Sequence, residues 1–151
     1  NLATKIDHLS RFPEILIAGC GTGQQAITTA SKFKNSHLTA IDLSLRSLSY
    51  AKRKTIELGM DIDYIQADIL DLGMLDKKFD IITARALAKT HKIVEISEHH
   101  LKPGGKYLLM KGVAEKINQE VVHLDNKKYS YTIHKKELTN HNRHILEINQ
   151  K

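Results

Sequence analysis

The sequence has little cysteine and no long hydrophobic run, and both shortages narrow the possible classes of protein. Cys20 is the only cysteine among 151 residues, so an internal disulfide is excluded, which fits a reducing compartment. No apolar stretch is long enough to span a bilayer, and the first residues lack the pattern of an export signal. We therefore expect a cytoplasmic protein without a membrane segment.

Negative charge is also in short supply, because 23 lysines and arginines face 17 aspartates and glutamates. The formal net charge of +6 attracts polyanions, since phosphates that bind cationic side chains release their counterions. Nucleic acid is therefore the favoured class of partner. The alternative is a basic surface that only keeps the protein in solution, because net charge reports association and not fold.

Short apolar runs alternate with helical periodicity along the chain, and each of the two prolines stands at the edge of an apolar run. The pattern predicts strands at residues 14–18, 37–42, 61–66, 79–84 and 106–110, then two β segments at 130–134 and 144–148. It predicts helices at residues 24–33, 45–58, about 88–101 and 113–124, with turns at 102–105 and around 140–142.

Strands that alternate with helices before a closing pair of β segments are typical of an α/β fold. We expect a mostly parallel sheet with helices on both faces and a C-terminal antiparallel hairpin. The length and the 41% share of hydrophobic residues fit a single domain over residues 1–151. Open sheets of this class bind ligands at the carboxyl ends of their strands, so we expect the functional site there.

The clearest chemical signal is the glycine-rich run GCGTG at residues 19–23, between the first predicted strand and the first predicted helix. Small residues there let the backbone turn sharply and let a ligand approach N–H groups near the start of a helix. Asp42 ends the next predicted strand, where its carboxylate can accept both hydroxyls of an adenosine ribose. Together these features predict an adenosine nucleoside site. The alternative is a plain turn, with Asp42 capping the following helix.

The glycine spacing resembles the first motif of class I S-adenosylmethionine-dependent methyltransferases. Dinucleotide-binding enzymes need a third glycine where this chain has Gln24, so a nicotinamide cofactor is the weaker choice. Residues 66–69 (QADI) resemble the adenine site of the same family, in which Asp68 would accept from the exocyclic amine and the neighbouring amide would read the ring. Asp68 as a local cap is the alternative. The resemblance implies a Rossmann-like methyltransferase fold with S-adenosyl-L-methionine as cofactor.

The two halves of the chain resemble different families of methyltransferase. Residues 13–82, with PEILIAGCGTGQQAI and AIDLSLRSLSYAKRKT, resemble the domains attached to tetratricopeptide repeats. Residues 79–148, with FDIITARALAK, HHLKPGGKYLLMKG and RHILEI, resemble the glucose-inhibited division protein B family, which methylates guanine N7 in small-subunit ribosomal RNA. Because loops after the fourth and fifth strands face the acceptor in these folds, the second resemblance implies ribosomal RNA, or the small ribosomal subunit, as partner.

Two cations are candidates for the acceptor side of the site. Arg85 lies just past the fourth predicted strand and Lys111 ends the fifth, so both should project from the same edge of the sheet as Asp42. The division-protein family has Arg-Ala and Lys-Gly pairs that match these positions. We interpret Arg85 and Lys111 as catalytic candidates, with Arg85 on guanine O6 or a phosphate; ordinary surface charge is the alternative. The cofactor is expected to contact Gly19, Cys20, Gly21, Thr22, Gly23, Asp42, Leu43, Ala67, Asp68, Ile69 and Arg85.

The chemistry of the acceptor agrees with this interpretation. Guanine N7 carries no proton, so its methylation needs alignment with the methyl donor more than a general base. The segment TARA at residues 83–86 offers no catalytic acid or base, and it lacks the Asn or Asp, prolines and aromatic that are usual in enzymes that methylate exocyclic amines. Methylation of base amines is therefore disfavoured.

Other functions remain open at this stage. An RNA enzyme predicts a basic stripe that joins Arg85, Lys111 and the lysine pairs at 127–128 and 135–136. A methyltransferase for a small molecule or a protein predicts an enclosed apolar pocket, and a binding domain without turnover predicts cofactor binding alone. Cys20 is interpreted as a small filler of the turn. No metal is expected, because the histidines at 99, 100, 141 and 144 lack further partners at ligand spacing.

Overall fold

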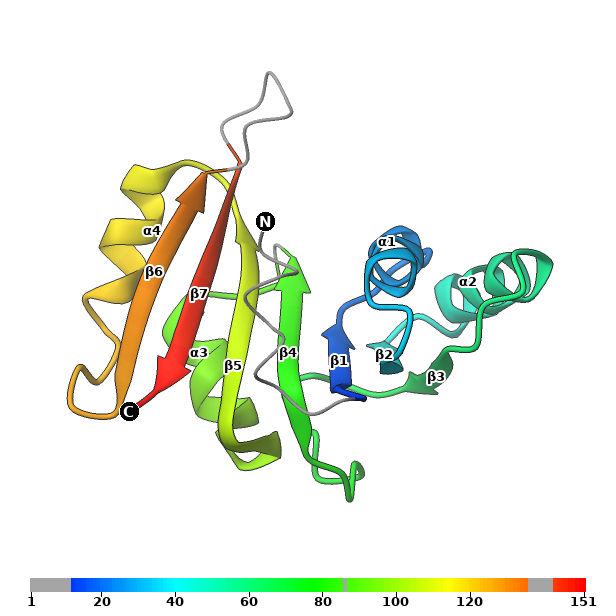
Figure 1. Cartoon of the computed structure of the whole chain (residues 1–151), viewed down its shortest axis with the longest axis horizontal. Coiled ribbons are helices and arrows are strands. Elements are labelled where there is room, and N and C mark those ends of the chain that lie inside the picture. The colour runs from blue at the N-terminus through cyan, green and yellow to red at the C-terminus, as the bar shows by residue number, and fades with distance from the viewer. Residues whose placement is uncertain (1–11, 86, 136–142) are drawn as a thin grey trace.

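The computed structural model describes residues 12–85, 87–135 and 143–151, and the strands within these residues form one seven-stranded sheet. The strand order is β3-β2-β1-β4-β5-β7-β6 (Figure 1). The strands are β1 (Glu14–Ala18), β2 (His37–Asp42), β3 (Asp63–Gln66), β4 (Phe79–Arg85), β5 (Leu101–Lys111), β6 (Tyr129–Lys135) and β7 (His144–Gln150). The described helices are α1 (Gln24–Lys32), α2 (Leu45–Glu57), α3 (Thr90–Ser97) and α4 (Ala114–Val121), and the 3-10 turn η2 (Glu98–His100) follows α3.

Pairing of the strands confirms the predicted fold class. Strands β3, β2, β1, β4 and β5 are parallel to one another, whereas β7 is antiparallel to both β5 and β6. The parallel strands therefore end together, at what we call the carboxyl edge: Ala18, Asp42, Gln66, Arg85 and Lys111. The opposite edge, where these strands begin, is called the amino edge. Strand β6 also ends at the carboxyl edge, because it runs antiparallel to β7 as β5 does.

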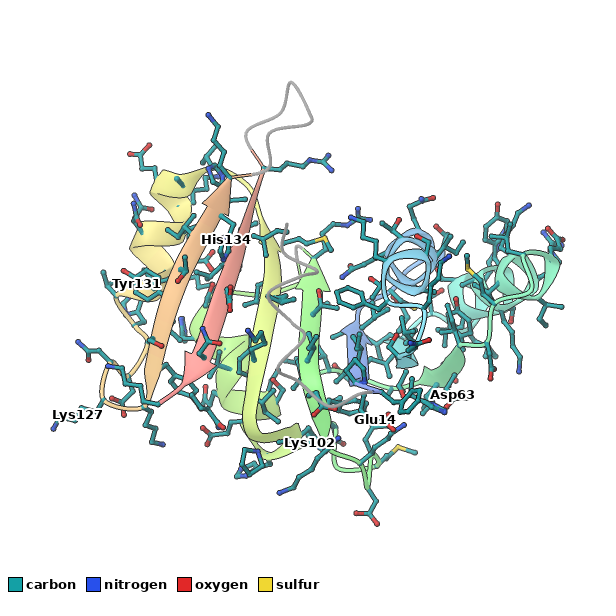
Figure 2. The ribbon with its side chains drawn as sticks, viewed as in Figure 1. Glu14, Asp63, Lys102, Lys127, Tyr131 and His134 are labelled. Carbon is teal, nitrogen blue, oxygen red and sulfur yellow. The ribbon has the colours of Figure 1, made fainter. Side chains whose placement is uncertain are left out.

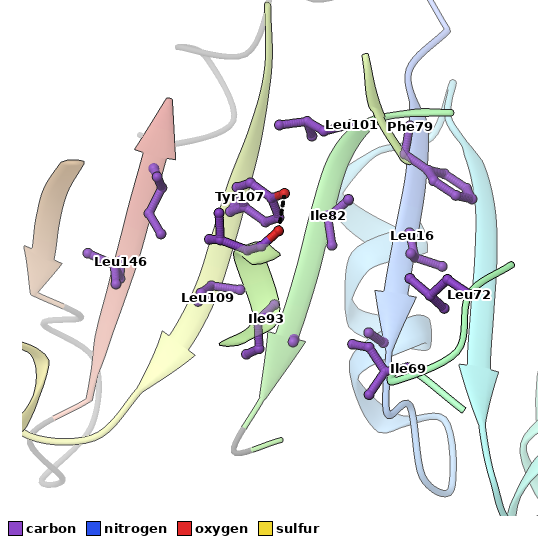
Figure 3. Close-up of a cluster of buried hydrophobic side chains, with 14 of the residues drawn as sticks. Leu16, Ile69, Leu72, Phe79, Ile82, Ile93, Leu101, Tyr107, Leu109 and Leu146 are labelled. Atoms are coloured by element: carbon purple, nitrogen blue, oxygen red, sulfur yellow. Dashed lines mark hydrogen bonds between the residues drawn. The ribbon is translucent and has the colours of Figure 1, made fainter. Parts of the chain in front are cut away.

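The strands in the centre of the sheet are mostly apolar because both of their faces are covered. In β1, Ile15 and Ile17 pack in one cluster with Ala26 of α1 and Leu48 of α2. The alternate residues of β1 face a second cluster, which is covered by α3 and α4. Figure 3 shows part of this second cluster, including Leu16, Ile82, Ile93, Leu109 and Leu146. Helices from both halves of the chain thus hold the sheet between two apolar layers.

The structure differs from the sequence prediction in a few boundaries. Strand β3 begins at Asp63, and α3 gives way to the 3-10 turn after Ser97. The predicted turn at 102–105 lies inside β5 as an irregularity, because the pairing passes from Phe79 with Leu101 to Ile81 with Lys106. The predicted turn around 140–142 lies outside the described residues. Within the described chain, none of the helices combines the length and hydropathy that crossing a bilayer requires.

Candidate functional site

The run at residues 19–23 forms the turn between β1 and α1, as its sequence predicts. Gly19, Gly21 and Gly23 have φ angles of 67°, 54° and 88°, which residues other than glycine rarely adopt. A Cβ on Gly23 would lie 2.7 Å from the Cβ of Ala51 in α2, so close packing requires glycine there. A Cβ on Gly21 would have no atom of the described residues within 4 Å. The backbone at Gly21 is therefore open to a ligand.

Asp42 connects this turn with the start of α2. Its Oδ2 accepts a 2.8 Å hydrogen bond from the N–H of Gly21, and its Oδ1 accepts one of 2.9 Å from the N–H of Ser44. Each carboxylate oxygen offers a second lone pair. Asp42 can therefore accept ribose hydroxyls while it keeps both backbone bonds, so the local capping role and the predicted ligand role are compatible.

The end of β3 lies beside Asp42, as the parallel pairing requires. The N–H of Ala67 donates to the Asp42 carbonyl at 3.2 Å, and the Asp68 carboxylate accepts from the N–H of Leu70 at 2.8 Å. The side chain of Ile69 is buried in the second apolar cluster, so only its backbone can face a ligand. Leu43 is 63% exposed. A carboxylate and an apolar side chain thus stand next to Asp42, which fits an adenine ring and its amine.

Two predicted residues of the turn differ in their environment. Thr22 is exposed, whereas Cys20 is buried beneath the turn. Burial, with a smaller effect from the Asp42 carboxylate, raises the pKa of the Cys20 thiol to about 11. The thiol is therefore protonated at neutral pH and is not suited to nucleophilic attack.

Arg85 is exposed at the end of β4, where it pairs in register with Met110 of β5. It lies on the strand next to β1, which leads into the glycine turn. The structure therefore brings Arg85 to the same edge as Asp42, as the sequence predicts.

Lys111 also ends at this edge, and its ammonium group is bound by other parts of the chain. Its Nζ lies 2.7 Å from Oε2 of Glu120 in α4 and donates to the Ala88 carbonyl at 3.1 Å. Only 11% of the Lys111 side chain is exposed. Two of the three donors of the ammonium group are therefore used within the protein.

The predicted basic stripe is divided between the two edges of the sheet. Lys135 pairs with His144, which pairs with Lys111, so these residues lie across three strands at the carboxyl edge. Figure 2 shows Lys127 far from His134, at the end where β6 begins. The prediction that residues 127–128 belong to the stripe was therefore wrong, while Lys136 lies outside the described residues. Exposed Arg143 adds a cation at the carboxyl edge.

Sequence reasoning missed two polar residues near this edge. Gln25 in α1 is buried and donates to the hydroxyl of Thr83 in β4. Glu120 accepts from Lys111 and from Thr90, at the start of α3. Burial by itself raises the pKa of Glu120, but the hydrogen bonds from Lys111 and Thr90 outweigh it and hold the pKa below its ordinary value. No local pattern marks these residues, because their partners come from other elements.

Taken together, the open backbone at Gly21, the Asp42 and Asp68 carboxylates and the exposed Leu43 fit an adenosine nucleoside better than a metal ion. Among the residues that the structure describes, no group of three or more His, Cys, Asp or Glu side chains could hold a metal.

Comparisons with known proteins point in the same direction. A family described as "Methyltransferase domain" matches residues 15–105. Ribosomal RNA small subunit methyltransferase G of Laribacter hongkongensis is 29% identical over 113 residues, which cover 72% of this chain and 55% of that protein. The protein of the same name from Chromobacterium violaceum is 27% identical over 108 residues, covering 72% of this chain and 52% of its own. The chain thus spans about half the length of the curated relatives it matches.

Solved structures share the fold over nearly the whole chain. A methyltransferase from Pyrococcus furiosus superposes with a TM-score of 0.75 at 23% identity, over 95% of this chain and 78% of that one. An rRNA methylase from Streptococcus thermophilus superposes with a TM-score of 0.71 at 18% identity, over 95% of this chain and 90% of that one. At these identities the likeness shows the Rossmann-like methyltransferase fold and nothing finer.

Proposed function

This chain belongs to the methyltransferase domain family, and on that premise we propose that it transfers a methyl group from S-adenosylmethionine to ribosomal RNA. The observation that carries the proposal is the bond between the Asp42 carboxylate and the N–H of Gly21, at the edge where Arg85 ends β4. This arrangement joins a nucleoside-binding carboxylate, an open glycine backbone and an exposed cation in one place.

In this proposal, different residues of the carboxyl edge bind different parts of the cofactor. S-adenosylmethionine supplies an electrophilic methyl group on a sulfonium centre. The Asp42 carboxylate accepts hydrogen bonds from the ribose hydroxyls, and the Asp68 carboxylate accepts one from the adenine amine. The backbone of Ile69 faces the adenine ring. Gly21 lets the ligand approach the turn, because no side chain of the described residues fills that space. Asp42 keeps its orientation through its bonds to Gly21 and Ser44, so little order has to be created on binding.

The acceptor in this proposal is guanine N7 of small-subunit ribosomal RNA. Support comes from the relatives named ribosomal RNA small subunit methyltransferase G and from the excess positive charge of the chain. Guanine N7 attacks through a lone pair without losing a proton, so the protein needs to align the base and has no need of a general base. Arg85 is proposed to hold guanine O6 or a phosphate, which leaves N7 free toward the methyl group.

Other parts of the proposal concern the whole protein. We propose that residues 1–151 form one domain, that the protein acts in the cytoplasm and that its partner is the small ribosomal subunit. The resemblance of the N-terminal half to domains attached to tetratricopeptide repeats stays a prediction.

Labelled S-adenosylmethionine and small ribosomal subunits that lack N7-methylguanine test the function directly. Transfer of the label to guanine N7, located by mass spectrometry of nuclease fragments, is the expected result. Arg85→Ala should lose at least tenfold in transfer, or about 1.4 kcal/mol. Label on a small molecule or a protein side chain alone would replace the RNA acceptor. Calorimetric binding of the cofactor without transfer to any acceptor would leave only a binding domain.

A further inference from the structure

One oxygen of Glu120 collects three hydrogen bonds from two other parts of the chain. Oε2 accepts from the N–H of Thr90 at 2.9 Å, from the Thr90 hydroxyl at 2.6 Å and from Nζ of Lys111 at 2.7 Å. The same ammonium group donates to the carbonyl of Ala88 at 3.1 Å. The side chains of α4 and β5 thus hold the backbone on either side of Lys89.

This contact replaces a cap that α3 lacks. The residue before the helix is Lys89, which makes no side-chain capping bond, and no acidic residue stands in the first turn. The N–H of Thr90 is one of the donors that a helix leaves without an intrahelical partner at its start, and Thr90 is completely buried. Glu120 supplies both the acceptor and the negative charge that the start of a helix favours.

The segment held in this way touches the glycine turn. A Cβ on Gly19 would lie 2.8 Å from Cδ1 of Leu87, so the Leu87 side chain lies directly against the backbone of the turn. Leu87 also packs on the second apolar cluster. Residues 87–90 therefore connect Glu120 on one side with the proposed cofactor turn on the other.

We infer that Glu120 is a positioning residue, whose carboxylate, oriented by Lys111, holds residues 87–90 against the glycine turn. The catalytic consequence of this inference rests on the proposed function. With residues 87–90 held in place, the acceptor base meets the methyl donor in a fixed geometry. Lys111 then acts through Glu120 and Ala88, and it makes no contact with the acceptor. A displacement of about 1 Å in such a segment is enough to slow transfer strongly, because alignment is what N7 methylation requires.

The first test measures the segment and needs no activity. Hydrogen exchange of the Thr90 amide should be at least tenfold faster in Glu120→Ala, because a buried N–H loses its acceptor. Glu120→Gln keeps an acceptor oxygen and should lie between Glu120→Ala and wild type. Glu115→Ala is the matched control, since it removes one exposed carboxylate from the same helix. Unchanged exchange at Thr90 in Glu120→Ala would overturn the inference.

The second test separates positioning from a simple ion pair. In the double variant Lys111→Glu with Glu120→Lys, opposite charges still face each other, but residue 120 no longer offers an acceptor to Thr90. Positioning predicts that this variant keeps the fast exchange of Glu120→Ala, whereas restored protection would assign the contact to charge pairing alone. Thermal unfolding of each variant confirms that it is folded.

The third test measures the consequence for methyl transfer. We expect Glu120→Ala to lower kcat at least tenfold, with KM for RNA and the Kd for S-adenosylhomocysteine within about threefold of wild type. An unchanged kcat would show that the position of residues 87–90 does not affect methyl transfer. If wild-type protein transfers no methyl group to RNA, the proposed function fails, and the exchange measurements still decide whether Glu120 holds the segment.

Discussion

Nε2 of Gln25 donates a 2.9 Å hydrogen bond to Oγ1 of Thr83, inside the protein and between residues 58 positions apart. The Thr83 hydroxyl in turn donates to the carbonyl of Leu108 at 2.7 Å. This buried polar chain joins the first turn of α1, which follows the glycine turn, to β4 and β5, which lead to the acceptor side. The two halves of the proposed site are therefore connected by hydrogen bonds as well as by apolar packing.

The Gln25–Thr83 pair makes a prediction about stability. Thr83→Val should lower the free energy of unfolding by about 1 to 3 kcal/mol, because it leaves the buried Gln25 amide without its acceptor. Adding Gln25→Leu should recover part of this loss, since two apolar groups then face each other. Urea denaturation of the single and double variants measures the coupling. Strictly additive losses would show that the two residues do not depend on each other.

Asp42 makes a prediction about cofactor affinity. Asp42→Ala should weaken binding of S-adenosylhomocysteine by about 1 to 3 kcal/mol, because the ribose hydroxyls lose their acceptor. Asp63→Ala is the control, since it removes an exposed carboxylate from β3 at the amino edge (Figure 2). Calorimetry measures both dissociation constants. Equal affinities of wild type and Asp42→Ala would remove Asp42 from the site.

The division of basic residues between the two edges makes a prediction about RNA binding. Removing Lys135 and Arg143 from the carboxyl edge should reduce the slope of log affinity against log salt by about 1.4 to 1.8, because each phosphate contact contributes about 0.7 to 0.9. Removing Lys127 and Lys128 from the other end of β6 takes away the same charge and should leave the slope nearly unchanged. Fluorescence anisotropy with a ribosomal RNA fragment measures both. Equal slopes for the two double variants would contradict binding at the carboxyl edge.

The Cys20 thiol makes a prediction about reactivity. Its pKa of about 11, against an ordinary value of 9.0, leaves about 100 times less thiolate at pH 8. Alkylation of the folded protein by iodoacetamide should therefore be at least about 100-fold slower than alkylation in denaturant. Mass spectrometry over time measures the two rates. Comparable rates would mean that the thiol is not buried and that its pKa is not raised.

Glu147 makes a prediction about acid stability. It accepts from Lys106 at 2.9 Å and lies 2.8 Å from the ring of His134. Burial raises the pKa of Glu147, but these hydrogen bonds outweigh it and the pKa lies below its ordinary value of 4.5. The stabilisation is therefore complete above about pH 4.5 and is lost as the pH falls through the lower value of the folded state. Between about pH 6 and about pH 3, wild type should lose more free energy of unfolding than Glu147→Gln, and urea titrations with equal losses would contradict this.

The central elements of the fold could be predicted from the sequence because their signals are local. Strands β1 and β2 lie at their predicted bounds, since a strand that is covered on both faces forms a short, mostly apolar run. The glycine turn required residues that tolerate positive φ, so GCGTG marked it directly. Asp42 could be predicted as a candidate site residue because it stands at the end of a predicted strand. The turn at 102–105 was harder to predict, because a bulge inside a strand uses the same residues as a true turn.

The sequence by itself therefore determined the α/β class, the glycine turn and the edge of the sheet at which the predicted residues meet. Only the tertiary structure decided which charges at that edge are free. Arg85 and Lys111 look alike in the sequence, yet Arg85 is exposed while Lys111 is held by Glu120 and Ala88. Likewise, Lys127 and Lys135 lie at opposite ends of β6. The physical reason is that periodicity and turn chemistry act between near neighbours, whereas the contact of Lys111 with Glu120 and Ala88 joins groups that only the packed elements bring together.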